Sequence, residues 1–197
     1  QNGASVRSQG CGGLPARPRP RHEECRIPEV LARRSRIETI ASAEDVTVLV
    51  SHRQYAVARG LLPDHVRLVE TTTDDAWVRD TGPSFVVDDA GDVRGVSWSF
   101  NAWGGLRGGL YFPWDADDLV GPKICDLQGV PVYRPSLILE GGSIDVDGEG
   151  TVLTTEECLL NPNRNPDLTR EQIEAELHAH LGTSKVIWLP RGAVNDA

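Results

Sequence analysis

The chain contains no methionine, and only two of its 20 basic residues are lysine. Because it begins with Gln1 and has no initiator methionine, we expect the sequence to be incomplete. No apolar run approaches the ~18 residues that a membrane-spanning helix requires, which excludes an integral membrane protein of that type. The N-terminus also lacks the apolar core of a signal peptide, so we expect a cytoplasmic protein.

The four cysteines form no close pair of the C-x-x-C kind, and no cluster of metal ligands stands out, so we expect reduced thiols and no metal site. Cys125 occupies an apolar helix position typical of a buried, inert thiol. Cys158 follows Glu156 and Glu157, whose negative charges disfavour a thiolate. We therefore find no pairing of cysteine and histidine that could supply a nucleophile within this chain.

Hydrophobic residues make up 39% and charged residues 25% of the 197 residues, which is typical of a globular domain. The net charge of −9 argues against a nucleic-acid-binding protein and fits an acidic pocket for a small cation. The charge is uneven, because residues 1–36 carry eight arginines and three acids whereas the rest is strongly acidic.

Residues 1–26 are rich in Gly, Pro, Ser and Arg without apolar periodicity, which predicts a disordered tail. A basic nucleic-acid-binding arm is the weaker alternative, because no aromatic residues lie between the arginines. The remaining pattern predicts an α/β fold. Helices are predicted over residues 29–43, 52–62, 115–127 and 170–181, with a Thr169–Gln172 capping box and Gly182 as the stop, and strands over residues 46–50, 66–69, 84–87, 93–97, 130–133, 143–146, 151–154 and 186–189.

An internal repeat is visible, because residues 82–93 align without a gap on residues 141–152, at an offset of 59. A chance similarity of two hairpins is the alternative. We expect each unit to comprise a strand, an acidic loop, a hairpin and a helix, and the strand at Val186 to begin a new unit. Such small units must pack on one another to bury their sheets.

The segment from Asp74 to Pro83 follows a predicted strand, where α/β proteins place ligand loops. It brings Asp74, Asp75, Trp77, Arg79 and Asp80 within seven residues. Crowded carboxylates favour a bound cation, and a planar guanidinium offers paired N–H donors to a carboxylate and a flat face to an indole. Arg79 could instead be an internal counter-ion, and a solvated, salt-bridged turn explains the pattern equally well.

Two further segments carry candidate site residues. Trp103 stands beside the pair Gly104–Gly105, where either a ligand approaches the backbone or the indole packs under a glycine turn. Glu140 follows a predicted strand in the second repeat, near the place of Asp80 in the first. We expect Asp80 and Glu140 to line one pocket, the alternative being that Glu140 caps a turn.

Together these segments resemble the agmatine deiminase family of the pentein, or guanidine-modifying, superfamily. The resemblance is carried by residues 74–83, 100–105, 139–143, 154–166 and 188–192, and it spans roughly residues 37–196. It implies a pentein-type five-fold α/β propeller, here truncated to about its first half. It also implies hydrolysis of agmatine to N-carbamoylputrescine and ammonia in putrescine and polyamine biosynthesis, without metal or organic cofactor.

The resemblance also implies roles for the candidate residues. Asp80 would grip the guanidinium, and Glu140 would orient a catalytic histidine or the substrate. Trp77 and Trp103 would form walls of the pocket, and Asp75 and Arg79 would contribute to substrate binding. The implied partner is a small cationic guanidine, neither nucleic acid nor membrane, and homo-oligomerisation of the full-length protein is left open.

The sequence departs from the family in three ways. The family's catalytic histidine and cysteine are expected beyond Ala197, residues 1–36 do not match, and Asp145 stands where the family commonly has histidine. We therefore predict an unmatched basic tail over residues 1–36, an incomplete pentein domain over residues 37–197, and a chain that is inactive by itself. The alternatives are a non-catalytic guanidinium-binding module and a peptidyl-arginine deiminase-like enzyme.

The composition of residues 1–26 generates a first testable prediction. Because this segment lacks apolar periodicity, its backbone amides should exchange with solvent at the rate of an unfolded chain. Hydrogen exchange followed by mass spectrometry measures this, with the predicted helix over residues 170–181 as the protected reference. Protection of residues 1–26 to the level of that helix would contradict the prediction.

Overall fold

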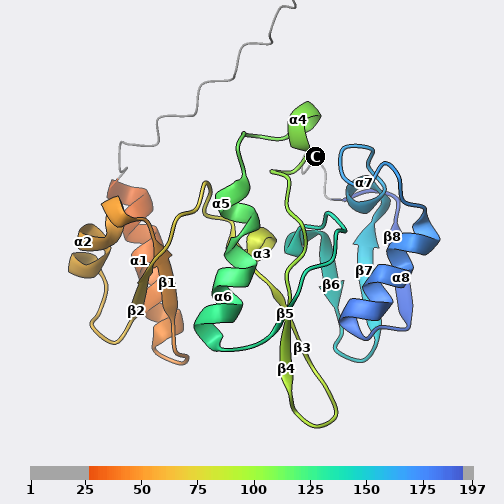
Figure 1. The fold of residues 1–197 in the computed structure, drawn as a ribbon. Coiled ribbons are helices and arrows are strands. Elements are labelled where there is room, and N and C mark those ends of the chain that lie inside the picture. The colour runs from red at the N-terminus through yellow and green to blue at the C-terminus, as the bar shows by residue number, and fades with distance from the viewer. Residues whose placement is uncertain (1–26, 193–197) are drawn as a thin grey trace, which may run out of the picture.

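The computed structural model describes residues 27–192, as drawn in Figure 1. The predicted tail over residues 1–26 lies outside the described residues, as do Cys11 and Cys25. Helix α1 (Ile27–Ala41) is the first described element and runs through the domain boundary predicted at residue 36. That boundary stays a prediction.

Three small sheets follow one another along the described chain. In the first, β1 (Thr47–Val50) pairs in parallel with β2 (Arg67–Glu70), and α2 (His52–Leu61) connects them. The second contains β3 (Ser84–Val87), β4 (Val93–Val96) and β5 (Val132–Tyr133), and the third contains β6 (Ile144–Val146), β7 (Thr151–Thr155) and β8 (Lys185–Leu189). In both three-stranded sheets the first two strands form an antiparallel hairpin and the third pairs in parallel with the second.

The helices of the second and third sheets lie where the sequence predicts them, with one difference. The helix predicted over residues 115–127 is divided at Leu119 into α5 (Asp115–Asp118) and α6 (Val120–Gln128). In α8 (Arg170–Leu181) the capping box of Thr169 and Gln172 is present and Gly182 ends the helix at φ 66°, which confirms both predicted ends. The short helices are α3 (Val78–Thr81), α4 (Gly105–Gly108), α7 (Glu156–Leu159) and the 3₁₀ turn η1 (Gly141–Ser143).

The structure confirms the internal repeat down to single contacts. Asp88 in one hairpin turn accepts the backbone N–H groups of residues 90 and 92. Asp147 in the other accepts those of residues 149 and 151, which are the same positions shifted by the offset of the sequence repeat. The strand registers shift by the same offset, since Val87 lies opposite Val93 and Val146 lies opposite Val152. A chance similarity of two hairpins does not account for this agreement.

The expected boundaries of the repeat are wrong, however. Strand β8 pairs with β7, so it completes the unit of the preceding hairpin and does not begin a new one. Likewise β2 belongs to the sheet of β1 and not with the hairpin that follows it. The physical reason is that a parallel strand requires a crossover connection, so the strand after each helix returns to the strand before it. We call residues 47–70 unit 1, residues 84–133 unit 2 and residues 144–189 unit 3.

Neighbouring units share their hydrophobic cores. The main cluster combines Val96 and Trp98 of unit 2 with Val152, Ile173 and Leu177 of unit 3. Helix α8 therefore packs on its own sheet and on the sheet of unit 2. Helix α6 lies between the sheets of units 1 and 2 in Figure 1, and it contacts β4. Units 2 and 3 thus bury their sheets against each other, as their small size requires.

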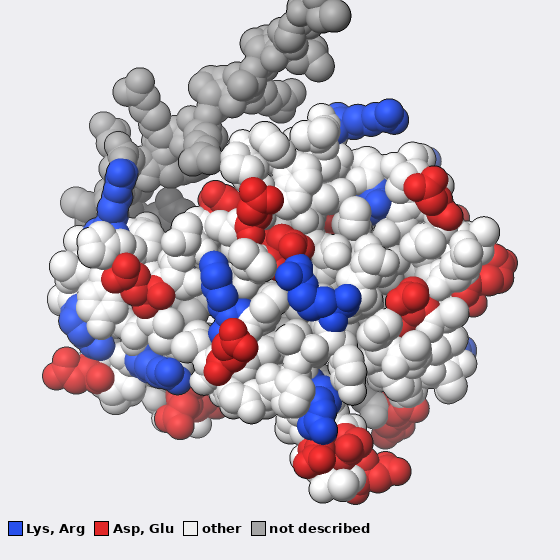
Figure 2. All heavy atoms as spheres, viewed as in Figure 1, with Lys and Arg blue, Asp and Glu red and all other residues white. Residues whose placement is uncertain are grey.

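Two further features of the described residues are the distribution of surface charge and the character of the helices. Figure 2 shows acidic and basic side chains interspersed over one face, with acidic side chains gathered at the tip of the β3–β4 hairpin. Between residues 27 and 192, the structure contains no helix with the length and apolar character needed to cross a bilayer.

The shared core generates the second prediction. Leu177 is fully buried between two units, so Leu177→Ala should lower the free energy of unfolding by roughly 2–5 kcal/mol. Leu106→Ala removes the same atoms from a side chain that is 81% exposed, and should change that free energy by less than about 0.5 kcal/mol. Urea unfolding of the chain measures both, and equal effects would contradict a core shared at this position.

Candidate functional site

The candidate site forms where three chain segments leave parallel strands. The parallel pairing of β4 and β5 continues as a bridge between Ser99 and Ile138, and the two segments end at Phe100 and Glu140. The third segment leaves the parallel strand β2 and leads to α3. Carboxyl ends of parallel strands are where α/β folds bind ligands, so the architecture brings the three predicted segments to one region.

Asp80 joins these three segments. Its Oδ1 atom accepts a hydrogen bond from the backbone N–H of Gly142 at 2.9 Å. Its Oδ2 atom accepts one from the indole Nε1 of Trp103 at 3.2 Å. The carboxylate therefore bridges the turn that follows Glu140 and the loop that carries Trp103, which brings Asp80 and Trp103 into contact; a pocket shared by Asp80 and Glu140 stays a prediction.

Glu140 is nearly sealed from solvent, with 3% of its surface exposed. Its carbonyl oxygen accepts hydrogen bonds from the backbone and hydroxyl of Ser143, while its side chain does not cap the turn. The Oε1 atom instead lies 2.6 Å from Nε of Arg164, in an ion pair whose side chains are 4% and 10% exposed. The Glu140 carboxylate is thus held by an ion pair. The alternative that Glu140 caps the turn with its side chain is wrong.

Trp103 sits in a tight loop of left-handed backbone. Ala102 and Trp103 have φ values of 55° and 60°, and Gly105 has φ 61°. A Cβ atom on Gly104 would lie 2.5 Å from the carbonyl carbon of Gly108, so only glycine permits this turn. The indole packs edge-on against Phe100 at 5.0 Å between ring centroids, which aims its N–H at Asp80.

Two residues that sequence analysis missed anchor the loop ahead of Asp80. Asp117 in α5 is fully buried, and its Oδ1 atom accepts the backbone N–H groups of Asp74 at 2.7 Å and Asp75 at 3.2 Å. Its other oxygen accepts the hydroxyl of Tyr111. Burial, and secondarily this hydrogen bond, raise the pKa of Tyr111 above its usual value, so the phenol stays protonated and donates.

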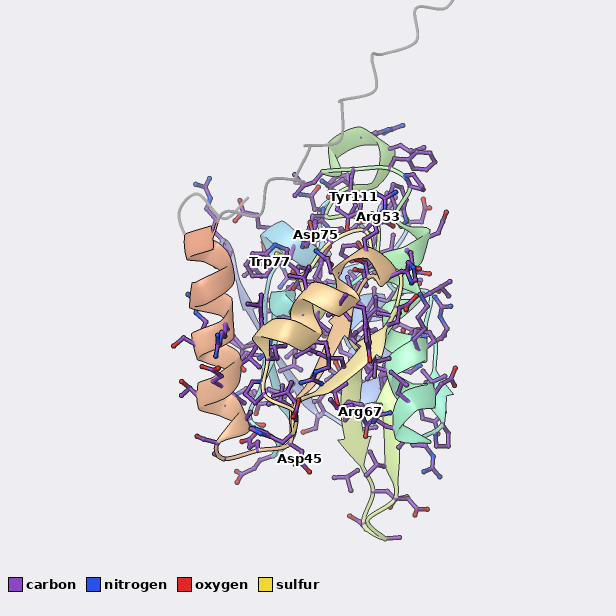
Figure 3. All side chains as sticks on the ribbon, turned by 90° about the vertical axis from the view of Figure 1, so that its left-hand side faces the viewer. Asp45, Arg53, Arg67, Asp75, Trp77 and Tyr111 are labelled. Carbon is purple, nitrogen blue, oxygen red and sulfur yellow. The ribbon has the colours of Figure 1, made fainter. Side chains whose placement is uncertain are left out.

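Tyr111 also links this anchor to the rest of the site, because its ring lies edge-on to Trp103 at 6.1 Å. The side view in Figure 3 shows Asp75, Trp77 and Tyr111 toward one end of the molecule, with Asp45 and Arg67 toward the other. No local sequence signal marks Asp117, because the N–H groups that it accepts lie 42 and 43 residues away in the sequence.

The other predicted site residues lie at the edge of this arrangement. Asp75 is half-buried and accepts the N–H of Ala76, while Trp77 is 63% exposed and precedes α3. Arg79 is exposed, and a Cβ atom on Gly141 would lie 2.2 Å from its carbonyl oxygen. The buried acid Glu140 is paired with Arg164, whereas a role of Arg79 as internal counter-ion of the carboxylates in its own segment stays a prediction.

The cysteines and cavities lie elsewhere. Cys125 is fully buried as predicted, and burial followed by the charge of Asp126 raises its pKa. Cys158 is half-buried beside Thr155, whose hydroxyl accepts its backbone N–H. The larger described cavity, about 510 Å³, contains none of the predicted site residues, and it is lined by His52, Val69, Glu70, Thr71, Thr72, Lys123, Asp126 and Leu127.

The sequence of this chain matches a known protein family. Residues 20–197 match the model of the Porphyromonas-type peptidyl-arginine deiminases. The chain belongs to this family. Its match begins before residue 37, where the resemblance read from the sequence begins.

The relatives in this family include proteins named agmatine deiminase. The chain is 62% identical over 161 residues to the agmatine deiminase of Ectopseudomonas mendocina, covering 81% of this chain and 44% of the relative. The solved agmatine deiminase of Enterococcus faecalis is 51% identical with a TM-score of 0.81, covering 84% of this chain and 46% of that chain. A substrate-bound agmatine deiminase of C. jejuni is 30% identical with a TM-score of 0.72, covering 84% and 48%.

The chain therefore spans a little under half the length of these relatives. The predicted pentein-type α/β fold, present only in part, is confirmed by the solved structures. The three units described above are the part of that fold which this chain carries.

The contact between Asp80 and the turn after Glu140 generates the third prediction. A Cβ atom on Gly142 would lie 2.3 Å from Asp80 Oδ1, so Gly142→Ala should push the carboxylate away and disturb its bond to Trp103. The indole N–H resonance of Trp103, assigned with Trp103→Phe, should shift in a ¹H–¹⁵N NMR spectrum. Gly60→Ala is the matched control, since nothing lies within 4 Å of its added Cβ. An unmoved resonance in Gly142→Ala would contradict the bridge.

Proposed function

We propose that this chain forms the substrate-gripping part of an agmatine deiminase, which hydrolyses agmatine to N-carbamoylputrescine and ammonia. The observation that carries the proposal is the bridge made by Asp80, which places a carboxylate and an indole beside the turn of a second, buried carboxylate. Relatives of this name at about 60% identity support the choice of substrate.

The chemistry of agmatine fits this arrangement. Its guanidinium is planar and cationic and presents paired N–H donors, which a carboxylate accepts in a forked geometry. We assign Asp80 to grip the guanidinium and Glu140 to orient either the substrate or the catalytic histidine. Trp77 and Trp103 would cover the flat faces of the substrate, because indoles attract cations. Asp75 and Arg79 would complete the substrate-binding rim.

The reaction needs groups that the described residues do not bring together. A guanidinium carbon is a poor electrophile, so hydrolysis requires a thiolate that adds to it and an acid that protonates the departing ammonia. Water then attacks the thiol-bound intermediate, which releases N-carbamoylputrescine and regenerates the thiol. The resemblance places this cysteine and histidine beyond Ala197. The role of this chain is thus to bind and orient the cation for groups supplied elsewhere in the complete protein.

A peptidyl-arginine deiminase is the second candidate. The name of the family favours it, and a solved relative described as a peptidyl-arginine deiminase is 32% identical with a TM-score of 0.74. The higher identity to agmatine deiminases, 51% to 62%, favours agmatine. We further propose that the complete protein acts in the cytoplasm in putrescine biosynthesis, and that it requires no metal or organic cofactor. A non-catalytic guanidinium-binding module remains the alternative to both enzymes.

The fourth prediction concerns activity. The complete protein that carries this chain should release ammonia from agmatine, and residues 1–197 alone should release none. In the complete protein, Asp80→Asn should lower kcat/KM by roughly 100-fold, because it removes the charge that grips the cation. Asp89→Asn, at the exposed tip of the β3–β4 hairpin, is the matched control and should leave kcat/KM unchanged.

The substrate panel separates the candidates. Release of ammonia from agmatine but not from peptides with an arginine residue supports the proposal, and the reverse preference supports the peptidyl-arginine deiminase. Binding of agmatine by the complete protein without any ammonia release would support the non-catalytic module. Ammonia release by residues 1–197 at the rate of the complete protein would refute our assignment of the nucleophile.

A further inference from the structure

Arg164 is the counter-ion of Glu140, and neither the sequence pattern nor the family resemblance assigned it a role. Its Nε atom lies 2.6 Å from Glu140 Oε1, and its Nη1 atom donates to Asn163 Oδ1 at 2.7 Å. The side chain is 10% exposed, so the pair is almost dehydrated. At this burial, loss of either charge leaves the other without compensation.

The backbone on both sides of Arg164 is fixed to the candidate site. On one side, the carbonyl oxygen of Asn163 accepts a hydrogen bond at 2.9 Å from Asn101, which also accepts the N–H of Gly104 in the Trp103 loop. On the other side, Asn165 exchanges two hydrogen bonds with the backbone of Ile138, two residues ahead of Glu140. Arg164 therefore cannot move independently of the residues that it supports.

The ion pair leaves one carboxylate oxygen of Glu140 available. Within residues 27–192 no hydrogen bond to Oε2 is present, and Oε2 is not among the side-chain atoms that are both sealed from solvent and without a hydrogen bond, of which the described residues contain one, in Arg59. Oε1 is thus held by the protein, whereas Oε2 keeps its capacity to accept a hydrogen bond. This is the arrangement expected of an acid that receives a donor from outside.

We propose that Arg164 is a positioning residue that holds the Glu140 carboxylate in place through Oε1, with Oε2 directed to the guanidinium of the substrate. The inference rests on the proposed function, because it concerns the same site. Arg164 acts through Glu140 and needs no contact with the substrate itself.

The experiment is a double-mutant cycle in the complete protein, with kcat and KM for agmatine and the thermal unfolding midpoint as readouts. Arg164→Gln should lower kcat/KM by roughly 100-fold, since it leaves a buried charge unpaired. Arg164→Lys should recover about tenfold of that loss, because it restores the charge without the planar fork. In a Glu140→Gln background, Arg164→Gln should change kcat/KM by less than about threefold, because coupled residues are not additive.

Arg170→Gln is the matched control. Arg170 pairs with Glu156 at the edge of unit 3, about 40% exposed on both sides, and its loss should leave kcat/KM unchanged. Loss of the buried pair lowers the unfolding midpoint in either case, but a merely structural role for Arg164 would leave kcat and KM of the folded protein unchanged or give losses that add to those of Glu140→Gln. Additive losses, or full activity in Arg164→Gln, overturn the inference.

Two precautions keep the outcomes separate. If Arg164→Gln does not fold, the inference is tested with Arg164→Lys and with the neutral pair Glu140→Gln/Arg164→Met. Equal kcat/KM for Arg164→Lys and the wild type overturns the inference. The wild-type protein is assayed first. An inactive wild type overturns the proposed function and this inference with it, whereas an active wild type with an unaffected Arg164→Gln overturns this inference alone.

Discussion

The carboxylate of Asp80 holds together segments that belong to different repeat units. One oxygen accepts a backbone N–H at the turn between units 2 and 3, and the other accepts the indole N–H of a loop in unit 2. Asp80 itself stands between units 1 and 2. Hydrogen bonds to a charged group are stronger than neutral ones, so this residue fixes the relative positions of the loops as well as the charge of the site.

The repeat explains why such a bridge is available. Units 2 and 3 each place a hairpin, a helix and a returning parallel strand in the same order, and unit 1 places a strand, a helix and a returning parallel strand, so the segments that leave equivalent strands face the same side of the molecule. Because the sheet of unit 2 is covered partly by helix α8 of unit 3, the loops between these units lie where the two units meet. A ligand bound there would contact residues far apart in the sequence.

The two buried acids Asp117 and Glu140 are stabilised in different ways. Asp117 is fully buried without a cationic partner among the described contacts, and backbone N–H groups and a phenol satisfy its oxygens. Glu140 is buried against Arg164 instead. The first arrangement orients a loop, whereas in the second only Oε1 of Glu140 takes part in the ion pair. The strongly negative composition of the chain therefore says little about which acids belong to the site.

The sequence alone determined the local features. Alternating and β-branched runs predicted the strands, the Thr169–Gln172 box and Gly182 predicted the ends of α8, and the 59-residue offset predicted equivalent hairpins. These features depend on neighbours within a few residues, which a sequence displays directly. The motif residues Asp80, Trp103 and Glu140 could be selected in the same way.

Only the tertiary structure decided which strand pairs with β8, which arginine neutralises Glu140, and that Asp117 anchors the loop before Asp80. Arg164 lies 24 residues from Glu140, so no local pattern in the sequence pairs the two. The physical reason is that pairing of strands and charges over such separations depends on how the units pack. Composition and spacing carry no record of that packing.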